Sequence, residues 1–526
     1  MPFIRNRDGC SSLRLKAIYG ILNQINRRFR DMNQSDRVFH PDILIVGSGI
    51  TGVSIARELS RYDVSVTVLE RGGDIAEGAT KANSGIVHAG YDALPGTRKA
   101  FYNTRGASMF PGLCNSLSVP YRKCGALVIG FDADDSQTLE KLYHRGILNG
   151  VKNLRLLTRE ETLDKEPSLN QEICGALDVP ESAIVSPYEL AYAIADDAAL
   201  NGVRFLFGQN ISSVSRSSQD RWKIETSSGC LFHCKIFINC AGASGAELHN
   251  MISDIRFHMT HRRGQYYLLD RSVSPPFTRT VFQCPSAMGK GVLVSPTVHG
   301  NLILGPNAED IDDPLNTETT QEGLSFVLSR AARTWPAVSV RSNITNFSGV
   351  RAHLDTDDFV VGPVSGVSGA FEAIGIESPG LSSAPAIAAD LASLVAGALS
   401  LRRKDSVVPP RKLKKSFHDM SDSERADAVR SDPAYGKIVC RCEMVTEAEI
   451  RDAIHRPVGA GTVDGIKRRT RAGMGRCQGG FCSPRVARII SEEKGIPMLE
   501  VTKDGGNSYL LSDTVESFLK GGAGND

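Results

Sequence analysis

The chain has 526 residues, 23% of them charged, and a formal net charge of +2. This length allows three or four domain-sized units, and the near-neutral balance excludes a strong overall field of the kind that attracts nucleic acid. Hydrophobic residues make up 41% of the chain, which is typical of a globular protein. Twelve cysteines in so long a chain are too few for a disulfide scaffold and suit a reducing compartment.

Residues 1–40 form an extension before the first predicted strand. Apolar residues recur at helical spacing between Leu13 and Phe29, among several basic residues and few acids. Such a helix is typical of a mitochondrial transit peptide or of a helix on a membrane surface. The alternative is an over-long start, with Met32 as the true initiator. We therefore expect a mitochondrial location if residues 1–31 are a transit peptide, and otherwise a cytoplasmic one, with peripheral membrane contact left open.

The next stretch has the order that dinucleotide binding requires. It runs strand, glycine-rich turn, helix, strand and acid, at 43–46, 47–52, 53–59, 64–69 and Glu70. Gly47 allows a tight turn, Gly49 lets the backbone approach a pyrophosphate, and Gly52 lets the helix pack close to the strand. The pyrophosphate is expected at the helix N-terminus, and Glu70 is expected to accept a hydrogen bond from a ribose hydroxyl.

The segment 81–90, KANSGIVHAG, follows the second strand. Its small residues allow the backbone to run against a flat ring system. It resembles the flavin-contacting loop of the glutathione-reductase-type flavoproteins, in the D-amino-acid-oxidase branch. Within that branch it is most similar to the FAD-dependent glycerol-3-phosphate dehydrogenases and oxidases, and next to the L-2-hydroxyglutarate dehydrogenases. The resemblance implies an α/β fold, with a Rossmann-like FAD-binding domain and an inserted mixed-sheet substrate domain.

We expect the following organisation along the chain. The oxidoreductase spans 41–400, with FAD-binding parts at about 41–123, 178–250 and 345–400 and substrate parts at about 124–177 and 251–344. Alternating apolar stretches in 251–344 favour a mixed or antiparallel sheet over the substrate. The most apolar run, 381–401, is interrupted by Ser, Pro and Asp390, which favours a buried helix over a membrane span. A basic linker at 401–436, a cysteine domain at 437–492 and a peripheral tail at 493–526 complete the chain.

Four of the cysteines lie close together near the C-terminus. Cys440, Cys442, Cys477 and Cys482 fall within 43 residues, and the other eight are scattered. Four thiolates suit tetrahedral zinc or a [2Fe–2S] cluster, but zinc sites usually have a two-residue gap and the gaps here are one and four. The flanking sequences resemble the bacterioferritin-associated-ferredoxin-like domain that is fused to the anaerobic type of glycerol-3-phosphate dehydrogenase. This resemblance implies [2Fe–2S], with zinc and a disulfide pair as less favoured alternatives.

The substrate site needs a base for the hydroxyl proton and an anchor for the rest of the substrate. His88 is the expected base, because an imidazole titrates near neutral pH. Arg351 and Lys290 are expected to hold a phosphate, and Ser84 and Ser378 could add hydrogen bonds. Each residue also has a non-catalytic alternative. His88 could be a structural histidine, Arg351 could form an inter-strand ion pair, and Lys290 could lie in an exposed loop.

The resemblance also implies a set of cofactor-binding residues from five separate segments. They are Gly47, Gly49, Ile50, Thr51, Gly52, Glu70, Arg71, Asn83, Ser84, Gly85, Gly242, Gly375, Pro379, Gly380, Leu381 and Ser382.

The resemblance implies oxidation of sn-glycerol 3-phosphate to dihydroxyacetone phosphate by hydride transfer to flavin. Electrons are then expected to pass through the [2Fe–2S] cluster to a quinone or a redox partner subunit. The alternatives are an L-2-hydroxyglutarate or amino-acid dehydrogenase of the same fold, and an electron-transfer subunit that turns over no substrate. The expected partners are therefore a small phosphorylated substrate and an electron acceptor, without nucleic acid.

Overall fold

The computed structural model describes residues 37–217, 221–273, 277–285 and 291–515. Residues 1–36 of the N-terminal extension and Lys290 lie outside the described residues, so the expectations for both stay predictions.

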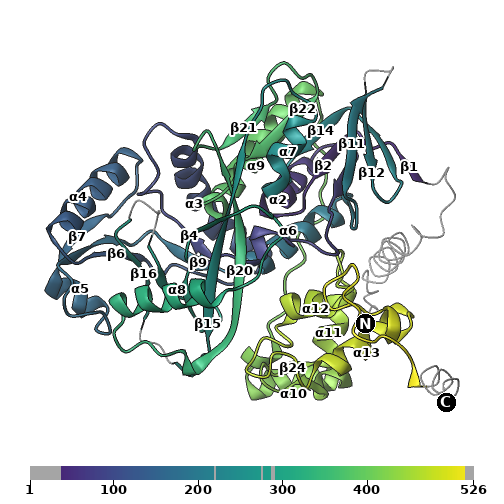
Figure 1. The fold of residues 1–526 in the computed structure, drawn as a ribbon. Coiled ribbons are helices and arrows are strands. Elements are labelled where there is room, and N and C mark those ends of the chain that lie inside the picture. The colour runs from purple at the N-terminus through teal and green to yellow at the C-terminus, as the bar shows by residue number, and fades with distance from the viewer. Residues whose placement is uncertain (1–36, 218–220, 274–276, 286–290, 516–526) are drawn as a thin grey trace, which may run out of the picture.

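A six-stranded sheet forms the centre of the first domain (Figure 1). Its strand order is β10 (Arg204–Leu206), β3 (Val66–Leu69), β2 (Ile43–Val46), β14 (Ile236–Asn239), β22 (Ala370–Ile374) and β21 (Val360–Pro363). All neighbours are parallel except the β21–β22 pair. The apolar strands β2 and β3 are buried along their whole length, as expected for central strands of a parallel sheet.

Helices cover this sheet and share its core. They are α2 (Ile50–Leu59), α3 (Arg98–Leu117), α6 (Pro187–Leu200) and α9 (Gly380–Ala398). Among the described residues, α9 is the one helix long and apolar enough to cross a membrane, but 61% of its most apolar window is buried inside the protein. It packs against α2 and α3, which agrees with the buried helix predicted from the interrupted apolar run.

A second, nine-stranded sheet carries the other half of the oxidoreductase. Its order is β19 (Glu309–Ile311), β15 (Met259–Leu269), β18 (Leu302–Gly305), β17 (Leu293–Pro296), β16 (Thr280–Gln283), β6 (Ala126–Gly130), β8 (Gly175–Val179) and β7 (Arg155–Thr158), and β20 (Asn343–Leu354) also pairs with β15. The β16–β6 pair is parallel and its other pairings are antiparallel. This confirms the predicted mixed sheet. Helices α4 (Ala133–Leu148), α5 (Arg159–Lys165) and α8 (Gln321–Thr334) pack on it.

Two smaller sheets and a short helix complete this part of the chain. One sheet has the order β1 (Val38–Phe39), β13 (Leu231–Cys234), β12 (Trp222–Thr226) and β11 (Ile211–Arg216), and the other has β4 (Ile86–Val87), β9 (Ala183–Val185) and β5 (Tyr121–Arg122). Helix α7 (Gly245–Asn250) follows β14.

The C-terminal lobe, residues 417–510, lies beside the first domain (Figure 1). It contains α10 (Asp422–Ser431), α11 (Glu447–Ile454), α12 (Val463–Thr470), α13 (Ser483–Lys494) and the ribbon of β23 (Ile438–Cys440) and β24 (Val445–Thr446). The sequence predicted a capped helix after Thr446, and Thr446 with Glu449 does form a capping box.

Two segments differ from the expectation for this region. The predicted linker is helical over α10, and its residues 433–436 pack against α11. The predicted peripheral tail contributes Val501, which is fully buried in the core of the lobe. Neither segment has a strong apolar period of its own; α10 begins at a capping box of Ser421 and Glu424, and Val501 is ordered by packing in the core of the lobe.

Candidate functional site

A large cavity of about 1530 Å³ opens at the carboxyl ends of β2, β3 and β14. Ligands of open α/β sheets bind at this edge, outside the ends of the parallel strands. The cavity continues to β15, β20 and α8 of the second domain. Its volume exceeds that of an ordinary small-molecule pocket, which leaves room for a dinucleotide and a substrate together.

The glycine-rich turn is built as the sequence predicted. Gly47 has φ +101°, and a Cβ there would lie 2.2 Å from the carbonyl oxygen of Cys240. A Cβ at Gly52 would lie 2.0 Å from the carbonyl oxygen of Gly47, so the close approach of helix and strand requires glycine. Helix α2 starts after Gly49 without a side-chain cap, and its first residues line the cavity. The positive helix end is thus available to a pyrophosphate.

Glu70 closes this turn from the end of β3. Its carboxylate accepts hydrogen bonds from the backbone N–H of Ser48 at 2.9 Å and of Gly72 at 2.8 Å, and from the Ser48 hydroxyl at 2.7 Å. The side chain also lines the cavity. These donors hold an anionic acceptor at the position where a ribose hydroxyl is expected.

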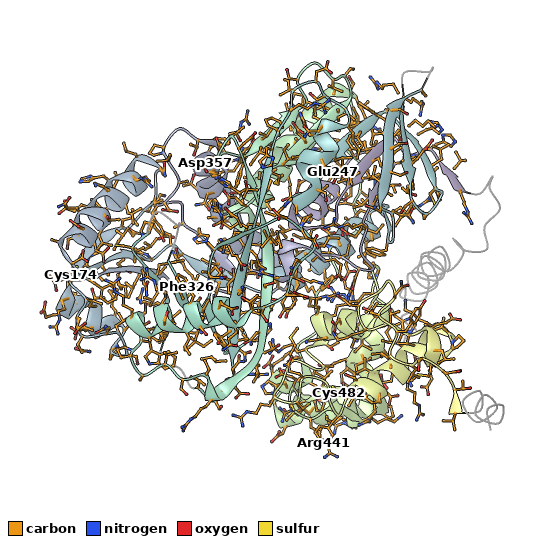
Figure 2. The ribbon with its side chains drawn as sticks, in the orientation of Figure 1. Cys174, Glu247, Phe326, Asp357, Arg441 and Cys482 are labelled. Atoms are coloured by element: carbon orange, nitrogen blue, oxygen red, sulfur yellow. The ribbon has the colours of Figure 1, made fainter. Side chains whose placement is uncertain are left out.

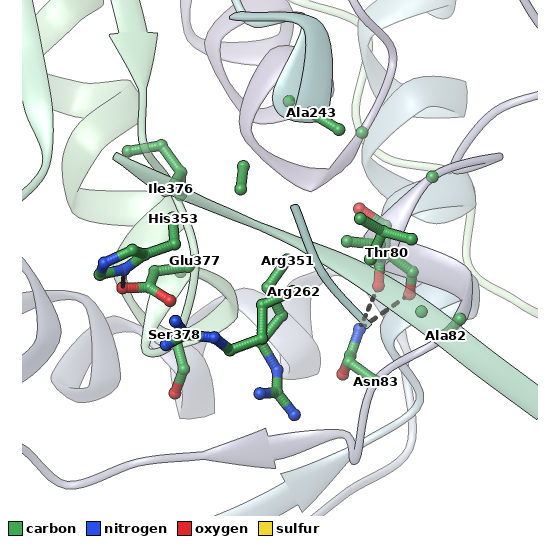
Figure 3. Close-up of a pocket in the computed structure, with 18 of the residues that line it drawn as sticks. Thr80, Ala82, Asn83, Ala243, Arg262, Arg351, His353, Ile376, Glu377 and Ser378 are labelled. Atoms are coloured by element: carbon green, nitrogen blue, oxygen red, sulfur yellow. Dashed lines mark hydrogen bonds and ion pairs between the residues drawn. The ribbon is translucent and has the colours of Figure 1, made fainter. Parts of the chain in front are cut away.

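Some residues of the flavin loop fix the shape of the loop, and others face the cavity. Asn83 donates to the carbonyl oxygens of Ala79 and Thr80, both at 3.0 Å, and accepts from Gly85 N at 2.8 Å (Figure 3). His88 faces the cavity, its ring 5.8 Å from the ring of Phe282.

Most of the predicted site residues line this one cavity. They are Gly47, Gly49, Ile50, Thr51, Glu70, Arg71, Asn83, Ser84, His88, Gly242, Arg351, Ser378, Pro379, Gly380 and Leu381. Gly52, Gly85, Gly375 and Ser382 stand behind its wall. Ser382 is fully buried, and its hydroxyl accepts a hydrogen bond from the backbone N–H of His88 at 2.8 Å. Ser382 therefore positions the loop that carries the histidine.

Arg351 and a second arginine lie opposite each other on the substrate side. Arg262 of β15 pairs in register with Arg351 of β20, and both line the cavity (Figure 3). Arg262 is neutralised by a two-point ion pair with Asp310, at 2.6 and 3.2 Å. A Cβ at Gly264 would lie 2.6 Å from Arg351 Nη2, so this glycine makes room for the guanidinium.

Arg351, unlike Arg262, has no carboxylate partner among the described residues. It is half-buried, and no carboxylate of the described residues lies within ion-pair distance of it; its guanidinium donates to the carbonyl oxygen of Asn307 at 3.4 Å. Burial raises the pKa of the neighbouring Tyr266 phenol, against the opposing effect of Arg351, so Tyr266 stays neutral. The inter-strand ion pair considered for Arg351 is therefore absent from the described structure, and its charge is available to an anion in the cavity.

Sequence reasoning missed several residues that line the cavity. Besides Arg262 and Tyr266, these include Lys99, Phe282, Arg330 and His353. The signal that could have found Arg262 is its register opposite Arg351, which only the pairing of β15 with β20 defines.

One group near the cavity has the donors of a metal site. His353, Asp357 and Glu377 offer ligand atoms within 4.8 Å of one another. Lys99 already lies among them, 2.8 Å from Glu377 and 3.2 Å from Asp357. Burial opposes ionisation of Glu377, but Lys99 and His353 outweigh it and hold the pKa of its carboxyl below the usual value. We assign this group to an internal ion-pair network.

The four cysteines of the C-terminal lobe come together as predicted. Every cysteine in the described part of the chain is a free thiol, and Cys442 Sγ lies 3.8 Å from Cys477 Sγ. This exceeds a disulfide bond but matches two ligands at tetrahedral positions about 2.3 Å from one metal ion. A hydrogen bond from Cys482 lowers the pKa of Cys440 to about 6. The four thiols thus lie together in one site, and four cysteine thiolates are the ligand set that a [2Fe–2S] cluster would take.

Buried ion pairs join this lobe to the cavity wall. Arg469 donates to both carboxylate oxygens of Asp74 at 2.6 and 2.7 Å, and Arg468 pairs with Glu77 and with Asp504. Glu77 lines the cavity. The segment expected to be a peripheral tail therefore supplies Asp504 to the domain interface.

A contact between a tyrosine of the oxidoreductase and a methionine of the C-terminal lobe also links the two candidate cofactor sites. The Tyr188 hydroxyl lies 3.7 Å from Met474 Sδ. Met474 precedes Gly475, where a Cβ would lie 2.3 Å from the Cβ of Cys442. On the other side, a Cβ at Gly85 would lie 2.5 Å from the carbonyl oxygen of Val185, three residues before Tyr188. The flavin loop and the cysteine loop are thus connected by van der Waals contacts.

Comparison with known proteins agrees with this reading of the two sites. Residues 42–394 match the family of FAD-dependent oxidoreductases, and residues 438–492 match the BFD-like [2Fe–2S] binding domain. The chain is 44% identical over 480 residues to a protein of Caloramator mitchellensis named glycerol 3-phosphate dehydrogenase, covering 91% of this chain and all of that protein. It is 30% identical to the glycerol 3-phosphate oxidase of Mycoplasma pneumoniae, covering 67% and 94% of the two chains.

A solved structure of a similar protein has the same fold over the oxidoreductase part of the chain. The reduced L-α-glycerophosphate oxidase of Mycoplasma pneumoniae with FAD bound superposes with a TM-score of 0.66 at 29% identity, covering 72% of this chain and 99% of that one. The cavity and the four-cysteine site fit FAD and a [2Fe–2S] cluster, and these are the cofactors of this chain. The protein therefore belongs to the FAD-dependent oxidoreductase family and carries a C-terminal BFD-like [2Fe–2S] domain.

Proposed function

We propose that this enzyme oxidises sn-glycerol 3-phosphate to dihydroxyacetone phosphate and that the electrons leave through the [2Fe–2S] domain to a quinone or a partner protein. The observation that carries this proposal is Arg351, a half-buried cation in the cavity with no carboxylate partner among the described residues. A cation in this setting favours an anionic substrate group. The names of the most similar relatives support a phosphate.

His88 is positioned to accept the hydroxyl proton of the substrate. The hydrogen bond from its backbone N–H to the buried Ser382 fixes the loop, and Phe282 packs beside the ring. The imidazole stands on the flavin loop, and Arg351 stands on β20, whose Gly349 packs against Ala82 of that loop. A substrate held by its phosphate at Arg351 can therefore present its secondary hydroxyl to His88.

Bound FAD supplies the two-electron oxidant, and the cluster supplies a one-electron outlet. The chain contributes the contacts between them. Tyr188 and Met474 join the flavin loop to the loop that carries Cys477, and Arg468 and Arg469 anchor the C-terminal lobe on the cavity wall.

A substrate with a carboxylate is the second candidate. A guanidinium also binds carboxylates in two-point geometry, and human mitochondrial L-2-hydroxyglutarate dehydrogenase is 29% identical to this chain, although the match covers only 51% of this chain and 60% of that one. The phosphate proposal is favoured by the wider coverage of the glycerol 3-phosphate relatives.

Anaerobic titration of the holoprotein tests this proposal. Glycerol 3-phosphate, L-2-hydroxyglutarate and a panel of amino acids are added in turn, and flavin absorbance and the cluster's electron paramagnetic resonance signal are recorded. We expect glycerol 3-phosphate alone to bleach the flavin and to produce the signal of a reduced [2Fe–2S] cluster. Bleaching by another compound would replace the proposed substrate. Bleaching without the cluster signal would overturn the proposed electron exit, and no bleaching at all would favour an electron-transfer subunit.

A further inference from the structure

The cluster site is asymmetric between its inner and outer ligands. Cys440 and Cys482 are buried at 1% and 2% exposure, whereas Cys442 is exposed and Cys477 partly exposed. The outer pair therefore forms an edge of the site that faces solvent. An electron acceptor too large to enter the protein can approach the cluster at this edge.

An exposed aromatic side chain stands next to this edge. The backbone N–H of Phe481 donates a hydrogen bond to the outer ligand Cys477, and Phe481 is 85% exposed, the highest value among the exposed large apolar side chains of the described residues. Leaving a phenyl ring in water has a free-energy cost that burial in an interface would recover. Aromatic side chains are also the usual anchors at the centre of protein interfaces.

Arginines outnumber acids around Phe481. The segment 471–488 contains four arginines and no acid, and the exposed ones are Arg476, Arg485 and Arg488. Arg476 is paired with Asp270 and Arg488 with Glu492, so Arg485 is the exposed arginine of this segment that has no acid partner among the described residues. Arg441, between the ligands Cys440 and Cys442, is also exposed and lies at the outer end of the lobe (Figure 2).

The one acid in the ligand loop does not offset these arginines at the surface. Glu443 is 7% exposed and is held by Arg271 and Arg471. Arg485 donates to the carbonyl oxygen of Ile438 and keeps its charge. Arg441 has neither a hydrogen bond nor an ion pair with the described residues. The face around Phe481 is therefore basic.

We propose that this basic face, formed by Arg441, Arg485 and Phe481 with the paired Arg488 at its border, is the docking surface for an acidic protein that accepts one electron at a time from the cluster. The inference deepens the proposed function and rests on it, because it takes the cluster as the electron exit. Charge complementarity steers such a partner to the exposed ligand edge and sets its orientation. A membrane surface fits less well, because a membrane-bound helix presents a continuous apolar face and this face has a single exposed aromatic residue.

Binding to a defined acidic carrier tests the proposal without turnover. The oxidised full-length holoprotein is titrated with an acidic plant-type [2Fe–2S] ferredoxin, and with a basic c-type cytochrome as the opposite-charge control. We expect binding of the ferredoxin alone, weakened at least tenfold when the salt concentration rises from about 0.05 to about 0.3 M.

Charge-reversal variants locate the surface. The double variant Arg485→Glu with Arg488→Glu on α13 avoids the cysteine ligands and their neighbours, and we expect it to weaken ferredoxin binding about tenfold or more. Phe481→Ala is expected to weaken binding at both salt concentrations, because its contribution is apolar. Matched controls on the second domain are Arg155→Glu and Leu148→Ala, whose side chain and residue are 60% and 75% exposed; both should bind as the unchanged protein does.

The outcomes separate this inference from the proposed function. Flavin bleaching and the cluster signal with glycerol 3-phosphate report the function, and ferredoxin binding reports the docking surface. If both spectroscopic signals persist but the ferredoxin does not bind, or binds the α13 double variant equally well, the docking proposal is wrong. Salt-sensitive binding to anionic lipid vesicles that the same double variant abolishes, without ferredoxin binding, would replace the protein partner by a membrane.

Discussion

The two cofactor sites of this protein are built in opposite ways. The FAD cavity collects residues from positions 46 to 381 and lies between two sheets. The cluster site takes its four ligands from 43 residues and leaves one pair of them at the surface. An enclosed site excludes water from the proton and hydride chemistry, whereas an electron exit must be reachable by an acceptor. The difference supports the proposal that the cavity handles the substrate and that the cluster meets the partner.

The largest expected effect is the loss of the cluster signal without the loss of flavin reduction. Cys442→Ser should abolish the [2Fe–2S] electron paramagnetic resonance signal, because a hydroxyl is a poor substitute for a soft thiolate ligand. Flavin bleaching by glycerol 3-phosphate should persist. The control is Cys174→Ser, which changes an exposed cysteine outside the site. Loss of both signals would mean that the two sites depend on each other for folding.

His88→Asn should lower kcat for glycerol 3-phosphate roughly 1,000-fold, because general base catalysis is removed. The flavin absorbance spectrum should stay unchanged, since the loop backbone is held through Ser382. Stopped-flow measurement of flavin reduction checks the step directly. A variant that reduces the flavin at the original rate would return His88 to a structural role.

Arg351→Ala should lower kcat/KM for glycerol 3-phosphate about 100-fold, chiefly through KM, because the substrate anion loses its anchor. Arg262→Ala is the matched comparison on the opposite strand. Arg262 is already paired with Asp310, so its loss should cost several-fold less. Equal losses in the two variants would show that both arginines bind the anion.

The smallest expected effect concerns the boundary between the two sites. Burial raises the pKa of Glu77 to about 7, against the opposing influence of Arg468 and Lys81. The folded protein therefore binds a proton between pH 4.5 and 7 that the unfolded chain has lost, and stability falls as the pH rises through this window. Glu77→Gln should flatten the dependence of Tm on pH there. Thermal unfolding of the holoprotein, followed by flavin fluorescence, measures this slope, and an unchanged slope would assign it to another group.

Local sequence was enough to predict a dinucleotide site and a four-thiolate metal site, and the resemblance to a known family then identified FAD and [2Fe–2S]. The turn from Gly47 to Gly52 and the acid Glu70 lie within one strand–helix–strand unit, and the four cysteines lie in one short segment. Their chemistry depends on backbone geometry and ligand type, which neighbouring residues dictate. Local sequence did not show that Gly52, Gly85, Gly375 and Ser382 lie behind the cavity wall, because that position depends on how separate segments pack.

Tertiary structure decided the substrate side and the interface. The pairing of β15 with β20 places Arg262 opposite Arg351 and gives the acid Asp310 to only one of them. The packing of the C-terminal lobe against the oxidoreductase brings Glu77 to Arg468 and Tyr188 to Met474. These contacts join residues far apart in the sequence, and no local propensity or spacing specifies which of many charged side chains will meet. The sequence by itself thus determined a dinucleotide turn and a four-cysteine ligand set, which its resemblance to a known family identified as FAD and [2Fe–2S] sites, and only the fold decided which charges remain free for a substrate and for a partner.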